Sequence, residues 1–183
     1  MMTHALKSLV PALLASLLAL TVQAAPDAPA AAPPRPAAAS PGLERFKKLA
    51  GEWEGKELEG HSPDQTVRVR YAVTAGGTAV VETLLPGSEH EMVTMIHGDG
   101  DDLLLTHYCM LGNQPQMKAA APGDAKAVPF KFVRATNLKS DKDMHMHDVT
   151  YTFVDDDTLR QEWTHYADGK AAGKVVFELK RKK

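Results

Sequence analysis

Histidine, methionine and a single cysteine are the residue types through which this 183-residue chain could most readily do chemistry. It has eight histidines and eight methionines, and several of them alternate with other residues in segments that read as extended. Residues i and i+2 of a β-strand point to the same face. His107 and Cys109 therefore share a face, as do His145, His147 and Tyr151. Such side chains suit recognition of a polar organic ligand or coordination of a soft metal ion.

A hairpin signal at Gly98–Asp101 brings two of these strands together. Symmetric pairing about this turn places His107 near Met92 and Cys109 near His90. All four side chains then lie on one side of the hairpin, and we expect this side to face the protein interior.

A second reversal at Asp155–Asp157 pairs the strand containing His147 with the strand that follows. Symmetric pairing sets His147 opposite His165 and Val149 opposite Trp163. A slip of one residue would reverse the two faces, so the interior assignment depends on this register. The predicted ligand-binding residues from both hairpins are His90, His107, Cys109, His145, His147, Tyr151, Trp163 and His165.

Three interpretations of this lining remain open. The leading one is non-catalytic binding of a small molecule, with no cofactor. The alternative is a zinc or copper site formed by His145, His147 and His165, in a metal-binding protein or metalloenzyme. The third is a structural or protein-interaction module in which the histidines hydrogen-bond one another and fill the interior. The spacings match neither a zinc finger nor a His-Glu-x-x-His motif.

Composition and motifs argue against several other functions. No serine lies in a Gly-x-Ser-x-Gly motif, which argues against a hydrolase of the nucleophile-elbow type. No glycine-rich phosphate loop is present, and a net charge of −2 supplies no basic field for nucleic acid. We therefore expect a binding protein rather than an enzyme. Cys109 is the only cysteine, so it cannot form an intramolecular disulfide, and we expect it to be buried.

The elements that would position these residues are short strands joined by tight turns. A short amphipathic helix over Leu43–Ala50 precedes them. Because closure removes exposed sheet edges, the pattern predicts an all-β fold, an antiparallel up-and-down barrel of about ten strands, with a β-sandwich as its rival. The expected strands are Glu52–Glu59, Val67–Val73, Thr78–Leu85, Glu89–His97, Asp102–Met110, Gln116–Ala121, Phe130–Arg134, His145–Val154, Thr158–Ala167 and Lys174–Lys180.

The amino-terminal segment has the features of an export signal. A short positive region precedes the apolar run 8–22, and small residues then allow cleavage after Ala24. We expect a signal peptide at 1–24, a Pro/Ala-rich spacer at 25–42 and one domain at 43–183. The protein would then be periplasmic or secreted, with no membrane association after cleavage.

The segment Leu49–Gly55 (LAGEWEG) resembles the Gly-x-Trp opening of the calycin barrels, which include lipocalins, fatty-acid-binding proteins and nitrobindin-like proteins. Gly51 and Trp53 match the Gly and Trp of that motif. The resemblance implies a short helix before the motif and a tryptophan that closes one barrel end against a basic residue of the last strand, here Lys180 or Arg181. The domain is also similar to uncharacterised exported bacterial domains of lipocalin-like type.

The nitrobindin-like branch of this resemblance raises the question of haem. A haem function of that type needs an axial histidine near the end of the chain. His165 is the nearest candidate, but the residues around it do not match the family's motif, so the resemblance does not extend to a haem site.

Overall fold

A computed structural model describes residues 40–183 of the protein. The predicted signal peptide (1–24) and nearly all of the predicted spacer (25–42) lie outside the described residues. The helix expected at Leu43–Ala50 is present and begins two residues earlier, at Pro41. Within residues 40–183, no helix combines the length and apolar character needed to cross a membrane.

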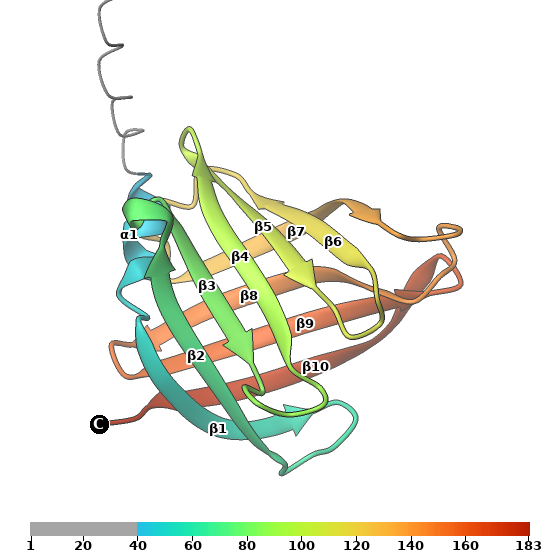
Figure 1. Ribbon diagram of the computed structural model, residues 1–183, viewed down its shortest axis with the longest axis horizontal. Helices are drawn as coiled ribbons and strands as arrows, with labels where there is room; N and C mark the ends of the chain where they lie inside the picture. Colours follow the sequence, from blue (N-terminus) through green and yellow to red (C-terminus); the bar gives the residue numbers. More distant parts are fainter. Residues whose placement is uncertain (1–39) are drawn as a thin grey trace, which may run out of the picture. The chain divides into compact units, whose positions relative to one another are not determined.

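Ten strands, one α-helix and one 3-10 turn make up this region (Figure 1). Their bounds are α1 (Pro41–Lys47), β1 (Gly51–Glu59), β2 (Thr66–Thr74), η1 (Ala75–Gly77), β3 (Ala79–Leu84), β4 (Met92–Asp99), β5 (Asp102–Tyr108), β6 (Gln114–Ala119), β7 (Ala127–Thr136), β8 (His145–Asp155), β9 (Thr158–Ala167) and β10 (Lys170–Arg181).

The strands form a closed barrel in which each pairs with its neighbours in sequence, and β1 closes the ring against β10. All pairings are antiparallel, and Trp53 lies opposite Arg181 at the closure. Gly55 permits this closure, because a Cβ at that position would overlap the carbonyl oxygen of Glu178. The expected up-and-down barrel is therefore confirmed, and a β-sandwich is excluded.

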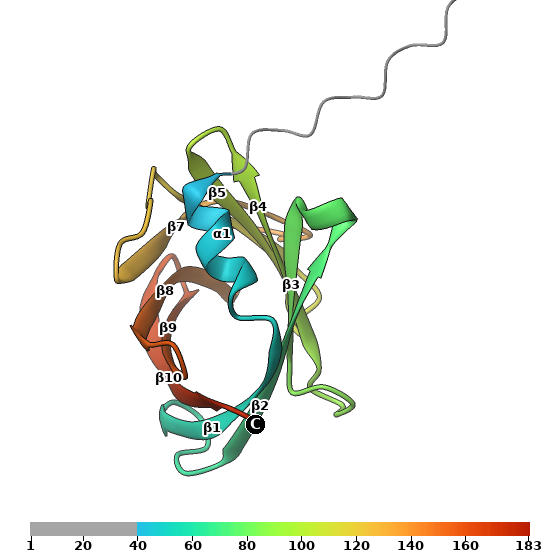
Figure 2. The same cartoon turned by 90° about the vertical axis from the view of Figure 1, so that its left-hand side faces the viewer.

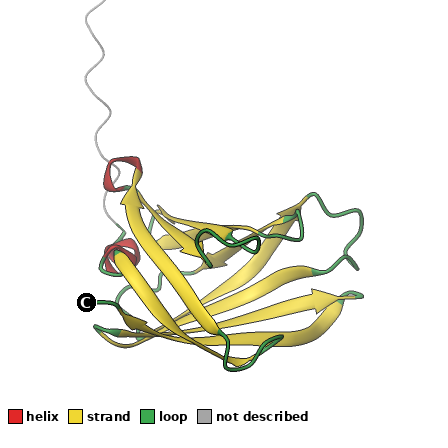
Figure 3. Ribbon diagram, turned by 60° about the horizontal axis from the view of Figure 1, so that its bottom comes forward, coloured by secondary structure: helices red, strands yellow, loops and turns green. Residues whose placement is uncertain are grey.

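Helix α1 lies across one end of the barrel (Figure 2), and both helical segments are found at this end (Figure 3). Phe46 is fully buried there and makes edge-to-face contacts with Phe130, Tyr151 and Phe153, at centroid distances of 5.9, 5.1 and 5.3 Å. Such contacts add to the apolar burial that docks the helix. This end of the barrel is consequently filled by side chains.

Trp53 and Arg181 seal the same end. The indole Nε1 donates a hydrogen bond to the Leu49 carbonyl over 2.7 Å, and the Arg181 guanidinium lies 4.4 Å from the ring centroid. Arg181 also donates to the Lys48 carbonyl at 2.8 Å and the Ala50 carbonyl at 3.0 Å. Of the two expected basic partners, Arg181 is therefore the one that contacts the tryptophan.

The β4–β5 hairpin keeps the expected faces but not the expected register. Asp99 pairs with Asp102, so the loop holds two residues, and Thr94 rather than Met92 lies opposite His107. The predicted register was wrong by two residues. Because side chains alternate with a period of two, that shift leaves His107 on the inner face.

The β8–β9 hairpin pairs Val149 with Trp163 as expected, but the predicted pairing of His147 with His165 is wrong. Met146 lies opposite His165 instead, because a β-bulge inserts His147 as an extra residue. A bulge changes the alternation on one side of the insertion. Met146, expected on the outer face, consequently faces inward.

The seam between β7 and β8 is short, joining Ala127–Phe130 to Val149–Thr152. Where the strands part, the Phe132 amide donates to the Asp148 carboxylate over 3.2 Å. The His147 ring stacks between Phe132 and Tyr166, with centroid distances of 4.5 and 3.7 Å. Aromatic side chains thus cover the gap that the backbone ladder leaves.

Candidate functional site

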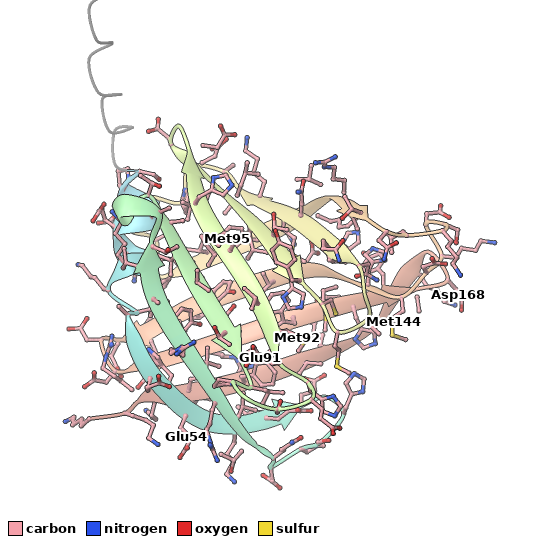
Figure 4. All side chains as sticks on the ribbon, in the orientation of Figure 1. Glu54, Glu91, Met92, Met95, Met144 and Asp168 are labelled. Carbon is pink, nitrogen blue, oxygen red and sulfur yellow. The ribbon has the colours of Figure 1, made fainter. Side chains whose placement is uncertain are left out.

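A cavity of about 320 Å³ lies at the barrel end opposite α1, where Met92 and Met144 are found (Figure 4). Apolar side chains of the strands form its walls, among them Val67, Leu84 and Phe177. Loops surround its mouth and contribute half-exposed methionines. Pockets in this size range are typical of sites for small organic ligands.

Five of the eight predicted ligand-binding residues line this cavity, and they come from four different parts of the barrel. His107 lies on β5, Trp163 and His165 on β9, and Cys109 and His90 on the loops after β5 and β3. The structure thus brings together side chains up to 75 positions apart in the sequence.

The other three predicted residues lie elsewhere, which corrects their assignment to the cavity lining. His145 and His147 pack against Phe132 and Tyr166 at the β7–β8 seam because the bulge takes them out of phase with the inner face. Tyr151 does point inward, as expected, but it is fully buried in the barrel centre, apart from the cavity lining.

Several lining residues were not among those predicted. His61 reaches the cavity from the β1–β2 loop, where strand alternation gives no guidance, and Glu57 reaches it from the end of β1. Met110 and Met144 also lie on loops, so strand alternation could not assign them to the cavity. Cavity methionines have adaptable thioethers that contact aromatic ligands favourably. The abundance of His and Met in the sequence was the only signal for this group.

His107 is the most deeply placed polar group of the lining. It is 2% exposed, its ring lies 4.8 Å from that of Trp163, and its Nδ1 is 3.0 Å from the Thr94 hydroxyl. Its Nε2 is buried and has no hydrogen-bond partner among residues 40–183. Burial lowers the pKa of the imidazole to about 4, so His107 is neutral at physiological pH.

Beneath His107, the centre of the barrel holds a carboxyl group. Glu82 is 1% exposed and accepts hydrogen bonds from the hydroxyls of Tyr71 at 2.7 Å and Tyr151 at 2.8 Å, and from Gln161 Nε2 at 2.5 Å. Burial raises the pKa of Glu82, while hydrogen bonds from these groups and from Thr94 lower it. Buried polar groups require such partners, and this carboxyl has an unusually full set.

The central carboxyl is connected to the cavity by two hydrogen-bonded routes. Gln161 accepts a bond from Trp163 Nε1 over 2.8 Å while donating to Glu82. Thr94 lies opposite Glu82 in the β3–β4 pairing, where it helps to lower the pKa of Glu82, and its hydroxyl is 3.0 Å from His107 Nδ1. Trp163 and His107 are thereby held in fixed orientations at the inner end of the cavity.

Cys109 is free and buried, as expected for a lone thiol. Burial raises the pKa of the thiol, which keeps it protonated and weakly nucleophilic. Cys109 therefore contributes an apolar, polarizable wall rather than a reactive group.

The alternative metal-ligand set is not assembled. His165 lies in the cavity, whereas His147 is stacked at the seam and the His145 Nδ1 is 2.8 Å from the Asp143 carbonyl. Within residues 40–183, no group of three or more His, Cys, Asp or Glu side chains is arranged to hold a metal ion.

Comparison with known proteins supports the fold alone. No protein-family model matches the sequence, and no curated protein sequence matches it significantly. Among solved structures, the barrel is similar to Rv2717c from M. tuberculosis, with a TM-score of 0.58 and 14% identity over 80% of this chain and all of that one. A protein of unknown function from the DUF3598 family of Nostoc punctiforme gives 0.49 and 13% over 75% of this chain and 49% of that one.

Proposed function

We propose that this protein is a non-catalytic binding protein that holds a small organic molecule in the cavity opposite α1. One observation carries the proposal: a largely apolar cavity is lined by His107, whose buried Nε2 has no hydrogen-bond partner in the described range. An unpaired buried polar atom costs free energy in the protein without ligand. A ligand that fills the cavity and pairs with this nitrogen removes that cost.

The lining also indicates the shape of such a ligand. Trp163 and His107 provide ring faces at the inner end, and Phe177 provides a third apolar surface. A cavity of about 320 Å³ is at the small end of the range for ligand sites, which favours a molecule of one or two rings over a long acyl chain.

The closed end supports a relationship to the calycin barrels as part of this proposal. Gly51 and Trp53 open β1 directly after a short helix, and Arg181 of the last strand covers the tryptophan. These are the features that the resemblance implied. Ligand binding at the opposite, open end fits that architecture.

Export remains part of the proposal and rests on the sequence of residues 1–24. Its test is the intact mass of protein recovered from the periplasm or medium of a bacterial host. The expected chain begins at Ala25. Retention of the first 24 residues, or recovery only from the cytoplasm, would contradict export.

The binding proposal is tested by blocking the cavity. Met92→Trp places a bulky ring within the lining, whereas Met95→Trp changes an outward-facing residue of the same strand and serves as the matched control. Native mass spectrometry of the untagged protein is expected to show a non-covalent organic adduct that Met92→Trp loses and Met95→Trp retains.

Two outcomes of this experiment would contradict the proposal. One is an adduct that survives in Met92→Trp with unchanged occupancy. The other is a protein that carries no adduct and binds nothing from a panel of one- and two-ring metabolites. Elemental analysis of the same samples tests the zinc or copper alternative, since a stoichiometric metal would favour it.

A further inference from the structure

The hydrogen bonds beneath the cavity determine which ring nitrogen of the neutral His107 carries the proton. The two oxygens of Glu82 accept bonds from Tyr71, Tyr151 and Gln161, and these three donors favour the ionised carboxylate. Thr94 lies directly opposite Glu82 in the β3–β4 pairing, and its side chain is among the groups that lower the pKa of this carboxyl. The carboxyl group therefore acts as the acceptor of this network, and the single hydroxyl proton of Thr94 is directed to it.

If the Thr94 hydroxyl donates its hydrogen bond to Glu82, its oxygen can only accept a hydrogen bond from His107. The Nδ1 of the neutral imidazole must then carry the ring proton and donate it to Thr94 Oγ1, 3.0 Å away. The other nitrogen, Nε2, is left with an unprotonated lone pair. This nitrogen is one of two buried atoms of the cavity lining that have no partner among residues 40–183, the other being Nδ1 of His165.

The charged residues around the cavity also favour a ligand that donates a hydrogen bond over an anionic ligand. In the part of the chain that the structure describes, no Lys or Arg lines the cavity, and Glu57 is the one acidic residue of the lining. The Glu82 carboxyl lies beneath it. A carboxylate ligand would therefore meet no cationic partner, whereas a neutral or cationic donor would be favoured.

We propose that the cavity selects flat ring ligands that donate an N–H or O–H hydrogen bond to His107 Nε2, and that it discriminates against carboxylates such as fatty acids. This inference rests on the proposed binding function and specifies its ligand class. A site built around a buried acceptor rejects a same-shaped molecule that lacks the donor, because the acceptor then stays unpaired.

Indole and benzofuran make a direct test, since they differ only in a ring N–H against a ring oxygen. By isothermal titration of the purified protein, indole is expected to bind at least tenfold more tightly than benzofuran. Benzoate, an anion of similar size, is expected to bind more weakly than indole by at least the same factor. Equal affinities for indole and benzofuran would overturn the inference and leave the proposed function standing.

Two variants and one spectroscopic measurement assign the preference to His107. His107→Phe is expected to bind both probes with a ratio near one, and Thr94→Val, which leaves the ring in place, is expected to reduce the ratio. The ¹⁵N resonance of His107 Nε2 in the unliganded protein should be that of an unprotonated ring nitrogen. A protonated Nε2 would overturn the inference whatever the affinities.

Absence of binding by either probe would also overturn the inference, because a two-ring donor is the class it specifies. That result would not decide the proposed function. The comparison of Met92→Trp with Met95→Trp tests the function separately.

Discussion

Glu82 and Tyr151 meet at the centre of the barrel, where the tyrosine hydroxyl donates to the carboxyl Oε2 over 2.8 Å. Glu82 lies on β3 and Tyr151 on β8, so the bond joins opposite walls across the interior. Edge-to-face packing of Tyr151 on Phe46 then links this polar centre to the helix that fills the closed end. The polar centre therefore contributes to stability as well as to the orientation of the cavity residues.

Tyr151→Phe should lower the free energy of unfolding by about 1–3 kcal/mol, because it removes a bond to a buried acidic group and leaves the ring in place. Urea denaturation followed by fluorescence measures the change. Tyr166→Phe is the control, since that ring is half-buried at the seam and its hydroxyl is not part of the central network. Equal effects of the two variants would show that the central bond adds little.

Arg181→Lys should destabilise the protein by about 1–2 kcal/mol, because a lysine cannot both cover the Trp53 ring and bond the Lys48 and Ala50 carbonyls. Thermal unfolding measures the loss. Arg68→Lys is the matched control, since Arg68 is exposed and pairs with Glu54 at the surface. A melting temperature unchanged by Arg181→Lys would show that these contacts of Arg181 do not stabilise the closed barrel.

His107 should make stability depend on pH. Its pKa is about 4 in the folded protein and 6.5 in the unfolded chain, so the unfolded chain takes up the proton first as the pH falls. The stability linked to neutral His107 is complete above pH 6.5 and is lost as the pH falls through about 4, by up to about 3 kcal/mol.

Chemical denaturation of the wild type and His107→Gln at pH 7 and pH 4.5 checks this dependence. Because both proteins retain Glu82, the difference between their slopes isolates the imidazole. We expect the wild type to lose more stability than His107→Gln over this interval. Parallel loss in the two proteins would mean that His107 is protonated in the folded state as readily as in the unfolded one.

His147→Ala should leave the affinity for indole unchanged, although the alternation of the sequence placed His147 among the ligand-binding residues. The substitution removes the ring between Phe132 and Tyr166, so it should lower stability by about 1 kcal/mol. Isothermal titration and urea denaturation measure the two effects. Loss of indole binding without loss of stability would contradict this prediction and show that His147 contributes to the binding site.

The fold was predictable because turns and alternation agree along the chain. The acidic turns between β4 and β5 and between β8 and β9, together with the apolar periodicity of β2, were sufficient to predict an antiparallel meander. Burial of Cys109 was predicted because a lone thiol would be sheltered in the oxidising compartment that the amino-terminal sequence suggests. The inner position of His107 followed from its spacing to Leu103 and Leu105, which are fully buried.

The bulge at His147 could not be predicted in the same way. One extra residue leaves no mark in composition, and His145, His147 and Val149 read as one continuous face. The insertion is visible only in pairing with β9, where Met146 and Asp148 lie opposite consecutive residues. The pairing of β8 with β9 therefore places His145 and His147, two of the eight predicted residues, outside the cavity lining.

The central carboxyl did leave a signal in the sequence. Glu82 is the one charged residue in the strand AVVETL, and it shares the inner face with Val80 and Leu84. A charged side chain on a buried face demands partners. The identity of those partners, Tyr71 and Gln161 among them, depended on the closed ring and could not be deduced from local spacing.

The seam between β7 and β8 is one of the two shortest in the barrel. Four residue pairs join these strands, as between β5 and β6, whereas ten join β9 to β10. Amide hydrogen exchange should therefore be faster in the residues of β7 beyond Phe130, where stacked rings replace the backbone ladder, than in β9 and β10. Substitutions in the Phe132–His147–Tyr166 stack should increase the frequency of local opening between β7 and β8 without changing the strand order. The stack therefore limits local unfolding of the barrel wall.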